Sequence, residues 1–381
     1  MQNLDLGIVP SPCFVLDLQK LRDNLHILGQ VKAACGAKIL LAQKAFAMFS
    51  VYPLLATVLD GVCSSSPYEA RLGREEFGGE VHSFAAAYSE SDLRSLLEYS
   101  DHIVFNSFSQ WQRFRELCLQ RSDDISFGLR VNPEHSEAAT ELYSPCARGS
   151  RLGIRREAFV GQDLDGISGL HFHTLCQQNA DALERSLTAF EQRFAEWIPG
   201  MRWLNFGGGH HITRADYDLD KLIGLVNTWK AKYDVDDIYL EPGEAVALNA
   251  GSLIATVLDL VENEGNIAIL NVSAAAHMPD VLEMPYRPEV RGAGQPGELG
   301  WDCRLAGHSC LAGDVIGSYS FERPLQVGDR IELLDMAIYS MVKTNTFNGL
   351  ALPSIAIWDS ATEHFHLQRS FTYEDFKNRL S

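Results

Sequence analysis

Short apolar runs recur along the first two thirds of the chain, and stretches with helical spacing separate them. Runs this short and this uniformly apolar are typical of parallel strands that are buried on both faces. The pattern therefore predicts eight strand–helix units. Their strands are expected at residues 38–44, 61–64, 81–84, 102–106, 125–131, 169–173, 203–207 and 238–242.

The segments between these runs support helices. Residues 89–98 begin with polar capping residues, and apolar residues then follow at helical spacing. Residues 179–190 and 217–232 show the same pattern. Eight such units predict an α/β fold, a (β/α)8 or TIM barrel. An open, doubly wound sheet is the alternative, but the glycine-rich turn expected after its first strand is missing.

The pattern changes after about residue 250, where turns rather than helices join the strand-like runs. This change predicts a C-terminal all-β domain, a β-barrel or sandwich. The extended residues 12–17 are candidates to pair with it. We therefore expect a barrel over residues 15–250 and a discontinuous β domain from residues 1–14 and 251–381. The predicted C-terminal strands are 253–260, 267–272, 313–319, 330–334 and 354–358.

The net charge of −18 argues against nucleic-acid and anionic-membrane partners, because both demand basic surfaces. It suits a cationic small molecule, although solubility alone also explains it. The first ten residues lack the pattern of a signal peptide, and no apolar run is long enough to cross a bilayer. The eight cysteines are scattered without a CxxC pair, which predicts reduced thiols, no metal site and a cytoplasmic enzyme.

In an α/β barrel the active site lies at the carboxyl ends of the strands. The first run ends in Lys44. A desolvated lysine is a good Schiff-base nucleophile, but a lysine at a strand end can also extend its ammonium group to solvent. From this position alone, both interpretations of Lys44 stay open.

Three later runs end in residues that could bind the same ligand as Lys44. His171 and His173 share one face of the sixth strand, so that one or both could face a ring-shaped ligand. Gly207, Gly208 and Gly209 end the seventh, where backbone amides can bind a phosphate. Glu241 ends the eighth and could pair with a protonated pyridine nitrogen. Together with Lys44, this set predicts pyridoxal 5′-phosphate (PLP) as cofactor.

At this point the chain resembles a known family, the fold-type III PLP decarboxylases, which are related to ornithine and diaminopimelate decarboxylases and to alanine racemase. Within it, the chain is most similar to the branch acting on carboxynorspermidine and carboxyspermidine. The resemblance implies that Lys44 holds PLP as a Schiff base, His173 stacks on its ring, Glu241 binds the ring nitrogen and the three glycines bind the phosphate. It rests on residues 41–47, 169–176, 205–210, 241–245, 283–288 and 341–349.

The resemblance also assigns roles in the β domain. Tyr339 is expected to reach the phosphate and to line the substrate site, and Cys310 to protonate the product carbanion. Asp314 is expected to bind the distal amine of the substrate. In this family the Cys310 loop enters the site of a neighbouring subunit, which implies a homodimer with shared active sites.

Two departures from the family pattern bear on the substrate. Ornithine-type enzymes have an arginine where this chain has Glu244, and a second acid suits a polyamine with several ammonium groups. Diaminopimelate decarboxylases have a glutamate after the cysteine, where this chain has Leu311. Arg287 is a candidate for a carboxylate or phosphate contact, although a surface arginine is the simpler interpretation.

The expected activity is therefore PLP-dependent decarboxylation of carboxynorspermidine or carboxyspermidine to norspermidine or spermidine, in polyamine biosynthesis. Three alternatives stay open. The chain could decarboxylate another basic amino acid, such as diaminopimelate, ornithine or arginine. It could be a racemase, or a catalytically inactive regulatory homologue.

Overall fold

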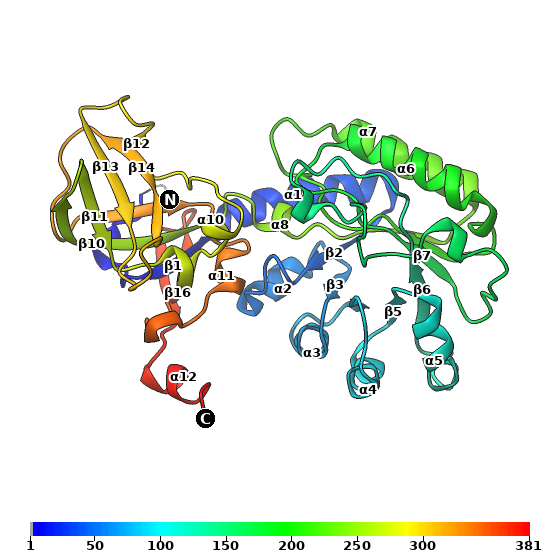
Figure 1. Cartoon of the computed structure of the whole chain (residues 1–381). Coiled ribbons are helices and arrows are strands. Elements are labelled where there is room, and N and C mark those ends of the chain that lie inside the picture. Colours follow the sequence, from blue (N-terminus) through cyan, green and yellow to red (C-terminus); the bar gives the residue numbers. More distant parts are fainter. Residues whose placement is uncertain (1–2) are drawn as a thin grey trace. The chain divides into compact units, whose positions relative to one another are not determined.

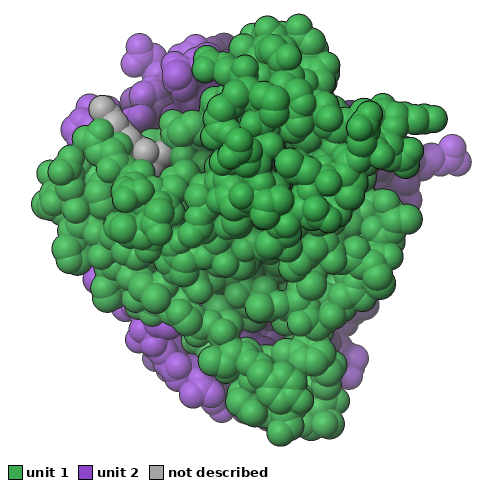
Figure 2. Space-filling model, turned by 90° about the vertical axis from the view of Figure 1, so that its left-hand side faces the viewer, with its two compact units in different colours: residues 1–23, 247–381 green, residues 24–246 purple. Residues whose placement is uncertain are grey.

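The structure is a computed structural model and describes residues 3–381. It divides into two compact units, which Figure 2 shows in different colours. Residues 24–246 form one unit, and residues up to Asp23 together with 247–381 form the other. The boundaries expected from the sequence are 15–250 for the barrel and 1–14 with 251–381 for the β domain, and residues 1 and 2 lie outside the described residues.

Eight parallel strands close into a barrel in the first unit, as the apolar runs predicted. Each strand pairs with the next in the sequence, and β2 pairs with β9 to close the ring. The strands are β2 (Lys38–Ala42), β3 (Gly61–Ser64), β4 (Glu80–Phe84), β5 (His102–Phe105), β6 (Ser126–Arg130), β7 (Gly169–His171), β8 (Trp203–Asn205) and β9 (Asp237–Leu240).

Helices lie between most of these strands and cover the barrel (Figure 1), whereas two short 3₁₀ turns lie between β6 and β7. Side-chain caps start several of them. The Ser89 hydroxyl accepts from the Asp92 amide in a capping box, and the Asn179 side chain accepts from the Ala180 amide. The helices are α1 (Leu18–Cys35), α2 (Tyr52–Leu55), α3 (Pro67–Glu76), α4 (Glu90–Tyr99), α5 (Phe108–Leu119), α6 (Ala180–Phe194), α7 (Leu219–Tyr233) and α8 (Glu244–Ala247).

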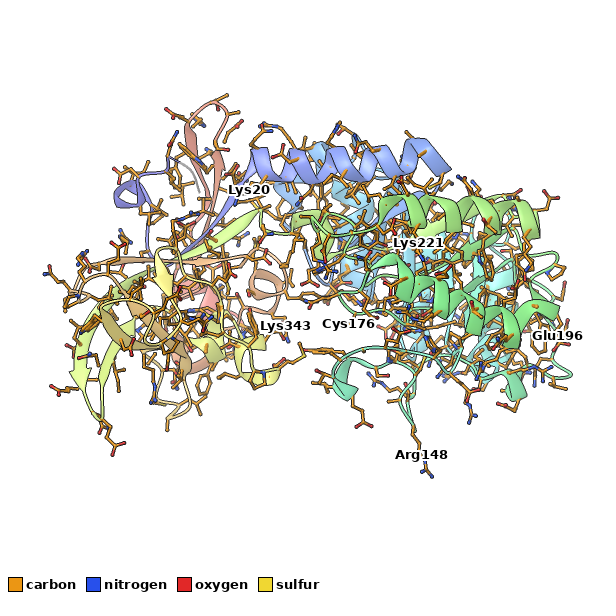
Figure 3. The ribbon with its side chains drawn as sticks, turned by 90° about the horizontal axis from the view of Figure 1, so that it is seen from above. Lys20, Arg148, Cys176, Glu196, Lys221 and Lys343 are labelled. Carbon is orange, nitrogen blue, oxygen red and sulfur yellow. The ribbon has the colours of Figure 1, made fainter. Side chains whose placement is uncertain are left out.

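The two longest helices after α1 lie side by side on the outside of the barrel. Lys221 of α7, labelled in Figure 3, donates to Glu184 of α6 at 2.8 Å. The inward faces of both helices are apolar, and the Phe190 ring of α6 stacks on the Trp229 ring of α7 at a centroid distance of 5.6 Å. Apolar burial therefore holds this pair against the strands, and ion pairs lie on its outer face.

The second unit contains a mixed nine-stranded sheet in the order β12-β14-β13-β11-β10-β1-β16-β17, with β15 paired to β10. Strand β1 pairs antiparallel with β10 and parallel with β16, so residues 12–17 contribute to this sheet. Its strands are β1 (Cys13–Asp17), β10 (Gly251–Glu262), β11 (Asn266–Leu270), β12 (Ala293–Gly294), β13 (Trp301–Ala306), β14 (Val315–Phe321), β15 (Arg330–Leu334), β16 (Ser354–Asp359) and β17 (His364–Arg369).

Four short helices accompany the sheet, and buried residues of the sheet and of the helical segment 274–281 form its larger core. The core contains Leu253, Leu270, Leu305, Tyr319 and Leu333. The helices are α9 (Ala274–His277), α10 (Asp280–Glu283), α11 (Ser340–Lys343) and α12 (Tyr373–Lys377). None of the helices between residues 3 and 381 has the length and apolarity needed to cross a membrane.

Candidate active site

The carboxyl ends of the barrel strands bring the predicted cofactor residues to one end of the barrel unit. Lys44 follows β2, His173 follows β7, the three glycines follow β8 and Glu241 follows β9. All eight strands run in the same direction. Residues far apart in the sequence therefore meet at this end.

Lys44 does not belong to its strand. Strand β2 ends at Ala42, and Lys44 lies in the turn that follows, where its side chain is exposed. The amide of Ala45 donates to the carbonyl of Ala42 at 3.0 Å and closes this turn. The turn places a flexible ammonium group at the rim, close enough for its charge to lower the pKa of His173.

The glycine loop, residues 207–209, packs tightly against the backbone of neighbouring segments. Gly207 and Gly209 adopt φ values of 69° and 84°, a region that favours glycine. A Cβ atom at Gly209 would lie 2.0 Å from the carbonyl oxygen of Leu175, and one at Gly208 would lie 2.5 Å from that of Glu241. Among the described residues, the amides of Gly209 and His210 have no hydrogen-bond acceptor, so they can bind an anion.

The ring of His173 is held by the same loop. The Gly208 amide donates to His173 Nδ1 at 2.9 Å, so the neutral ring carries its proton on Nε2. Burial, and then the positive charges of Lys44 and Arg130, hold the pKa of His173 well below its ordinary value. His173 is therefore a neutral, oriented aromatic ring, as stacking on a cofactor requires.

Glu241 is a buried carboxylate with several donors. Asn205 Nδ2 donates to Oε1 at 2.8 Å, and His171 Nε2 lies 3.4 Å from Oε2. Burial acts to raise the pKa of Glu241, but the charge and hydrogen bond of His171 and the hydrogen bond of Asn205 outweigh it, and the pKa falls well below its ordinary value. An anionic carboxylate at this depth can keep a facing pyridine nitrogen protonated.

The sequence did not assign a definite role in the site to three residues of this network. Asn205 joins the glycine loop to the acid, because its Oδ1 accepts from the Gly207 amide at 2.8 Å. His171 was considered only as a second ring-facing histidine. Arg130 ends β6, is 4% exposed and donates to the carbonyl of His173 at 3.3 Å. The sequence feature that could have indicated Arg130 is its position as a charged residue within the apolar run 125–131.

Glu244 begins α8 and lies close to the glycine loop. Its Oε1 accepts from Gln177 Nε2 at 2.6 Å, and its Oε2 lies 3.5 Å from His211 Nε2. Gln177 follows Cys176, which Figure 3 labels. The acid therefore lies at the cofactor end of the barrel, and a role in binding substrate stays a prediction.

Cys310 and Asp314 lie in the loop between β13 and β14 of the sheet unit. Cys310 is exposed, with a free thiol, and its amide donates to Asn348 Oδ1 at 2.8 Å. Asp314 is 3% exposed, and its two oxygens accept from the amides of Ala274 at 2.6 Å and Ser309 at 3.2 Å. In this unit Asp314 braces the loop that presents Cys310. Its predicted contact with a substrate amine stays a prediction.

Arg287 and Tyr339 also belong to the sheet unit. The Arg287 guanidinium lies 4.5 Å from the ring centroid of Tyr319, and its Nη1 donates to the carbonyl of Ser318 at 3.3 Å. Tyr339 is the N-cap residue of α11 and has a φ of 52°, a value that few residues other than glycine adopt. The predicted roles of both side chains in the active site stay predictions.

Comparison with known proteins places this geometry in a family. The family profile described as "Pyridoxal-dependent decarboxylase, C-terminal sheet domain" matches residues 13–337. The carboxyaminopropylagmatine decarboxylase of Synechocystis sp. is 45% identical over 100% of this chain and 98% of its own length. The carboxynorspermidine/carboxyspermidine decarboxylase of Campylobacter jejuni is 43% identical over 97% of this chain and 98% of its own length.

The chain belongs to the pyridoxal-dependent decarboxylase family. A solved structure agrees. The crystal structure of carboxynorspermidine decarboxylase from Campylobacter jejuni, complexed with norspermidine, superposes with a TM-score of 0.89 at 40% identity, covering 97% of this chain and 100% of that one. This decarboxylase is therefore a PLP-dependent carboxy-lyase.

The residues at the barrel end fit PLP. The amides of Gly209 and His210 without acceptors suit its phosphate, and no side chain beyond glycine fits at Gly209. The anionic Glu241 suits the ring nitrogen, and the neutral His173 suits the ring face. The exposed Lys44 at the rim carries an amine that suits covalent attachment, and this role stays a prediction. The decarboxylase thus carries the donor set that PLP needs, within one unit.

Proposed function

We propose that the chain decarboxylates the carboxyaminopropyl group of a carboxylated polyamine, with carboxynorspermidine and carboxyspermidine as substrates and norspermidine and spermidine as products. The observation that carries this proposal is full-length similarity, above 40% identity, to enzymes named for such substrates. A similar carboxynorspermidine decarboxylase has been solved in complex with norspermidine. The acid at position 244 supports a substrate with ammonium groups, and the leucine after Cys310 argues against diaminopimelate.

A second candidate substrate is carboxyaminopropylagmatine, and the identity of 45% over the whole chain favours it. By their names, these compounds share the carboxyaminopropyl group and differ at the far end. That end is a guanidinium in the agmatine derivative and a primary ammonium in the others. The chemistry at the cofactor is the same for all three, so the choice depends on the groups that bind the far end.

Bound PLP supplies an electron sink for the pair released when the Cα–carboxylate bond breaks. The residues of the chain position the cofactor and control its protonation. Glu241, held by Asn205 and His171, keeps the ring nitrogen protonated. Lys44 would hold PLP through its side-chain amine, the position for which the substrate's α-amine competes. His173 fixes the plane of the ring, because its own orientation is fixed by Gly208.

A proton must return to Cα after carbon dioxide leaves, and we propose Cys310 as its donor. Its thiol is exposed in the sheet unit, in a loop that Asp314 and Asn348 brace. We further propose, from the family resemblance, that this loop completes the active site of a second copy, so that the working form is a homodimer. Tyr339, Glu244 and Arg287 are proposed to line the substrate site.

The test is a side-by-side measurement of carbon dioxide release from carboxynorspermidine, carboxyspermidine, carboxyaminopropylagmatine, diaminopimelate and ornithine. We expect the highest kcat/KM for carboxynorspermidine or carboxyspermidine. A higher kcat/KM for the agmatine derivative would select the second candidate, and turnover of ornithine or diaminopimelate at an equal or higher rate would refute both. Racemisation without carbon dioxide release, or no turnover of any compound, would support the remaining alternatives.

A further inference from the structure

A second cluster of potential ligands lies at the other end of the barrel. Glu80 and His102 are the first residues of β4 and β5, and His82 is the third residue of β4. They therefore lie at the amino ends of the strands, whereas Lys44 and the glycine loop lie at the carboxyl ends. None of the three residues takes part in the proposed chemistry.

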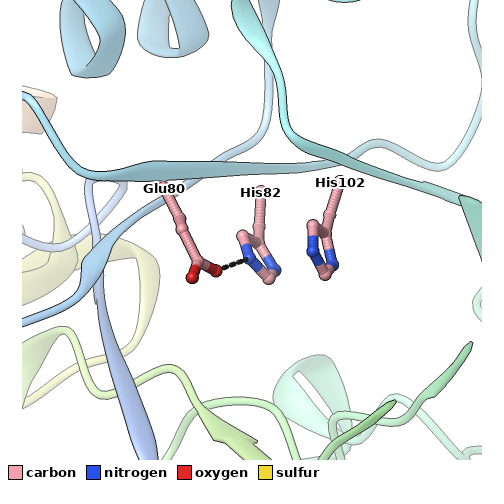
Figure 4. A group of neighbouring side chains, drawn as sticks. All are labelled: Glu80, His82 and His102. Atoms are coloured by element: carbon pink, nitrogen blue, oxygen red, sulfur yellow. Dashed lines mark hydrogen bonds and ion pairs between the residues drawn. The ribbon is translucent and has the colours of Figure 1, made fainter. Parts of the chain in front are cut away.

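Strand register brings the three side chains together inside the barrel. His82 and His102 are directly paired across β4 and β5, and Glu80 and His82 lie two positions apart, on the same face of β4. The two rings stack with centroids 3.9 Å apart, and His82 Nε2 lies 3.0 Å from Glu80 Oε2 (Figure 4). One potential ligand atom from each residue lies within 4.8 Å of the others.

Two nitrogens of this cluster have no partner among residues 3–381. Nδ1 of His82 and Nδ1 of His102 are both buried without a hydrogen bond, and the His82 residue is 2% exposed. Buried polar atoms almost always have partners, so two neighbouring exceptions call for an explanation. An imidazole nitrogen that accepts no hydrogen bond can instead coordinate a metal ion.

A cavity of about 500 Å³ gives access to the cluster. Glu80 and His102 both line it, together with Asp101 and Arg202. An ion entering this way would meet one carboxylate and one imidazole directly, with His82 behind them. The side facing the cavity would remain open for water as a fourth ligand.

We infer that Glu80, His82 and His102 bind one divalent first-row transition-metal ion, with water as a further ligand. Two imidazoles and a carboxylate form a donor set that such ions prefer. The rings of His82 and His102 are stacked, so they must turn on binding for one nitrogen of each to point at a shared ion at about 2.1 Å. The ion would cross-link β4 to β5 in the barrel unit.

The charge around the cluster permits a cation. Lys38 Nζ lies 2.6 Å from Glu80 Oε1, but it also lies 3.3 Å from Asp237 Oδ2. Two carboxylates therefore surround one ammonium group and leave one negative charge in excess. The second oxygen of Glu80 faces His82 and Tyr239 rather than Lys38, so the ion and Lys38 can share the carboxylate.

The test uses the chelator-treated holoenzyme and Co²⁺, a divalent first-row transition-metal ion that binds imidazole nitrogen. Calorimetric titration should show one strong equivalent per chain. His82→Gln and His102→Gln should each weaken binding by about 10-fold or more. The double variant His364→Gln/His366→Gln, which removes two exposed histidines from β17, should bind Co²⁺ like the wild type.

Co²⁺ binding that survives both barrel variants, or that disappears in the β17 variant, would overturn the proposal, as would the absence of a strong equivalent. Because a barrel variant could fail to fold, X-ray absorption of the Co²⁺-loaded wild type gives a second answer. Scattering from two imidazoles supports the site, and scattering from fewer overturns it. The thermal midpoint of the holoenzyme should rise by about 5 °C at 100-fold excess of Co²⁺ over its Kd.

Discussion

Replacing Gly209 by alanine tests the glycine loop most directly. Gly209 has a φ of 84°, and an added Cβ would lie 2.0 Å from the carbonyl oxygen of Leu175. Both obstacles are backbone features, so no side-chain rotation relieves them. The loop must move away from Leu175, and its amide then moves away from the position proposed for the phosphate.

The expected loss of stability in Gly209→Ala follows from two costs, the left-handed conformation and the steric contact. A left-handed conformation costs a residue with a Cβ about 1–2 kcal/mol, and an added methyl group in a packed region costs about 1–3 kcal/mol. We therefore expect Gly209→Ala to lower the free energy of unfolding by about 2–5 kcal/mol. If the loop moves instead, a loss of about 2 kcal/mol in binding lowers the PLP affinity by about 30-fold.

Alanine variants at two other glycines allow the conformational cost and the steric cost to be measured separately. Gly78 has a φ of 78°, but a Cβ there meets nothing within 4 Å, so Gly78→Ala should show only the conformational cost. Gly224 lies inside α7 with neither obstacle, and Gly224→Ala should stabilise the helix by about 0.5–1 kcal/mol. Neither of these positions lies in the glycine loop, and both variants should keep the PLP affinity of the wild type.

The assays are urea unfolding of the cofactor-free protein and a PLP titration followed by absorbance. The reasoning is wrong if Gly209→Ala unfolds and binds PLP like the wild type. It is also wrong if Gly78→Ala lowers the free energy of unfolding as much as Gly209→Ala does, because the contact with Leu175 would then add nothing.

Three further predictions concern single side chains. Lys44→Ala should abolish carbon dioxide release yet change the free energy of unfolding by less than about 0.5 kcal/mol, because the side chain is exposed; full activity in the variant would refute the assignment. Glu241→Gln should lower kcat by about 100-fold with little change in KM, measured by initial rates, because the amide cannot hold the ring nitrogen protonated; an unchanged kcat contradicts this. Burial lowers the pKa of His210 from 6.5 to about 4, so below pH 6.5 the unfolded chain binds a proton that the folded chain does not. Stability should therefore fall as the pH drops from about 6.5 to about 4, by about 3 kcal/mol from this residue. His210→Gln should flatten the measured curve in that range, and an identical slope would exclude His210 as its cause.

The barrel was predictable because its strands are buried on both faces. Each predicted run overlaps an observed strand, although several runs extend beyond it. The run 38–44 is an example, since β2 ends at Ala42 and a turn carries Lys44. Apolarity records burial rather than hydrogen bonding, and the turn residues Ala45 and Phe46 are buried as deeply as the strand.

The sheet unit was less predictable, and β13 shows why. Its Cys303 and Leu305 are buried, whereas Asp302 and Arg304 are exposed. A strand with one solvated face alternates apolar and polar residues. The search for continuous apolar runs therefore missed β13, although it found the more continuously apolar strand β10.

The sequence by itself determined the eight-stranded barrel, the separate sheet domain and the residue types at the cofactor end, because the length of apolar runs, the spacing of helical segments and glycine-rich strand ends are local properties. Only the tertiary structure decided how those residues support one another. Asn205 links the glycine loop to Glu241, Gly208 orients His173, and Asp314 braces the Cys310 loop. The pairing of His82 with His102 depends likewise on the register of two strands. Such contacts join residues distant in the chain, and their geometry exists only once the strands have paired and the barrel has closed.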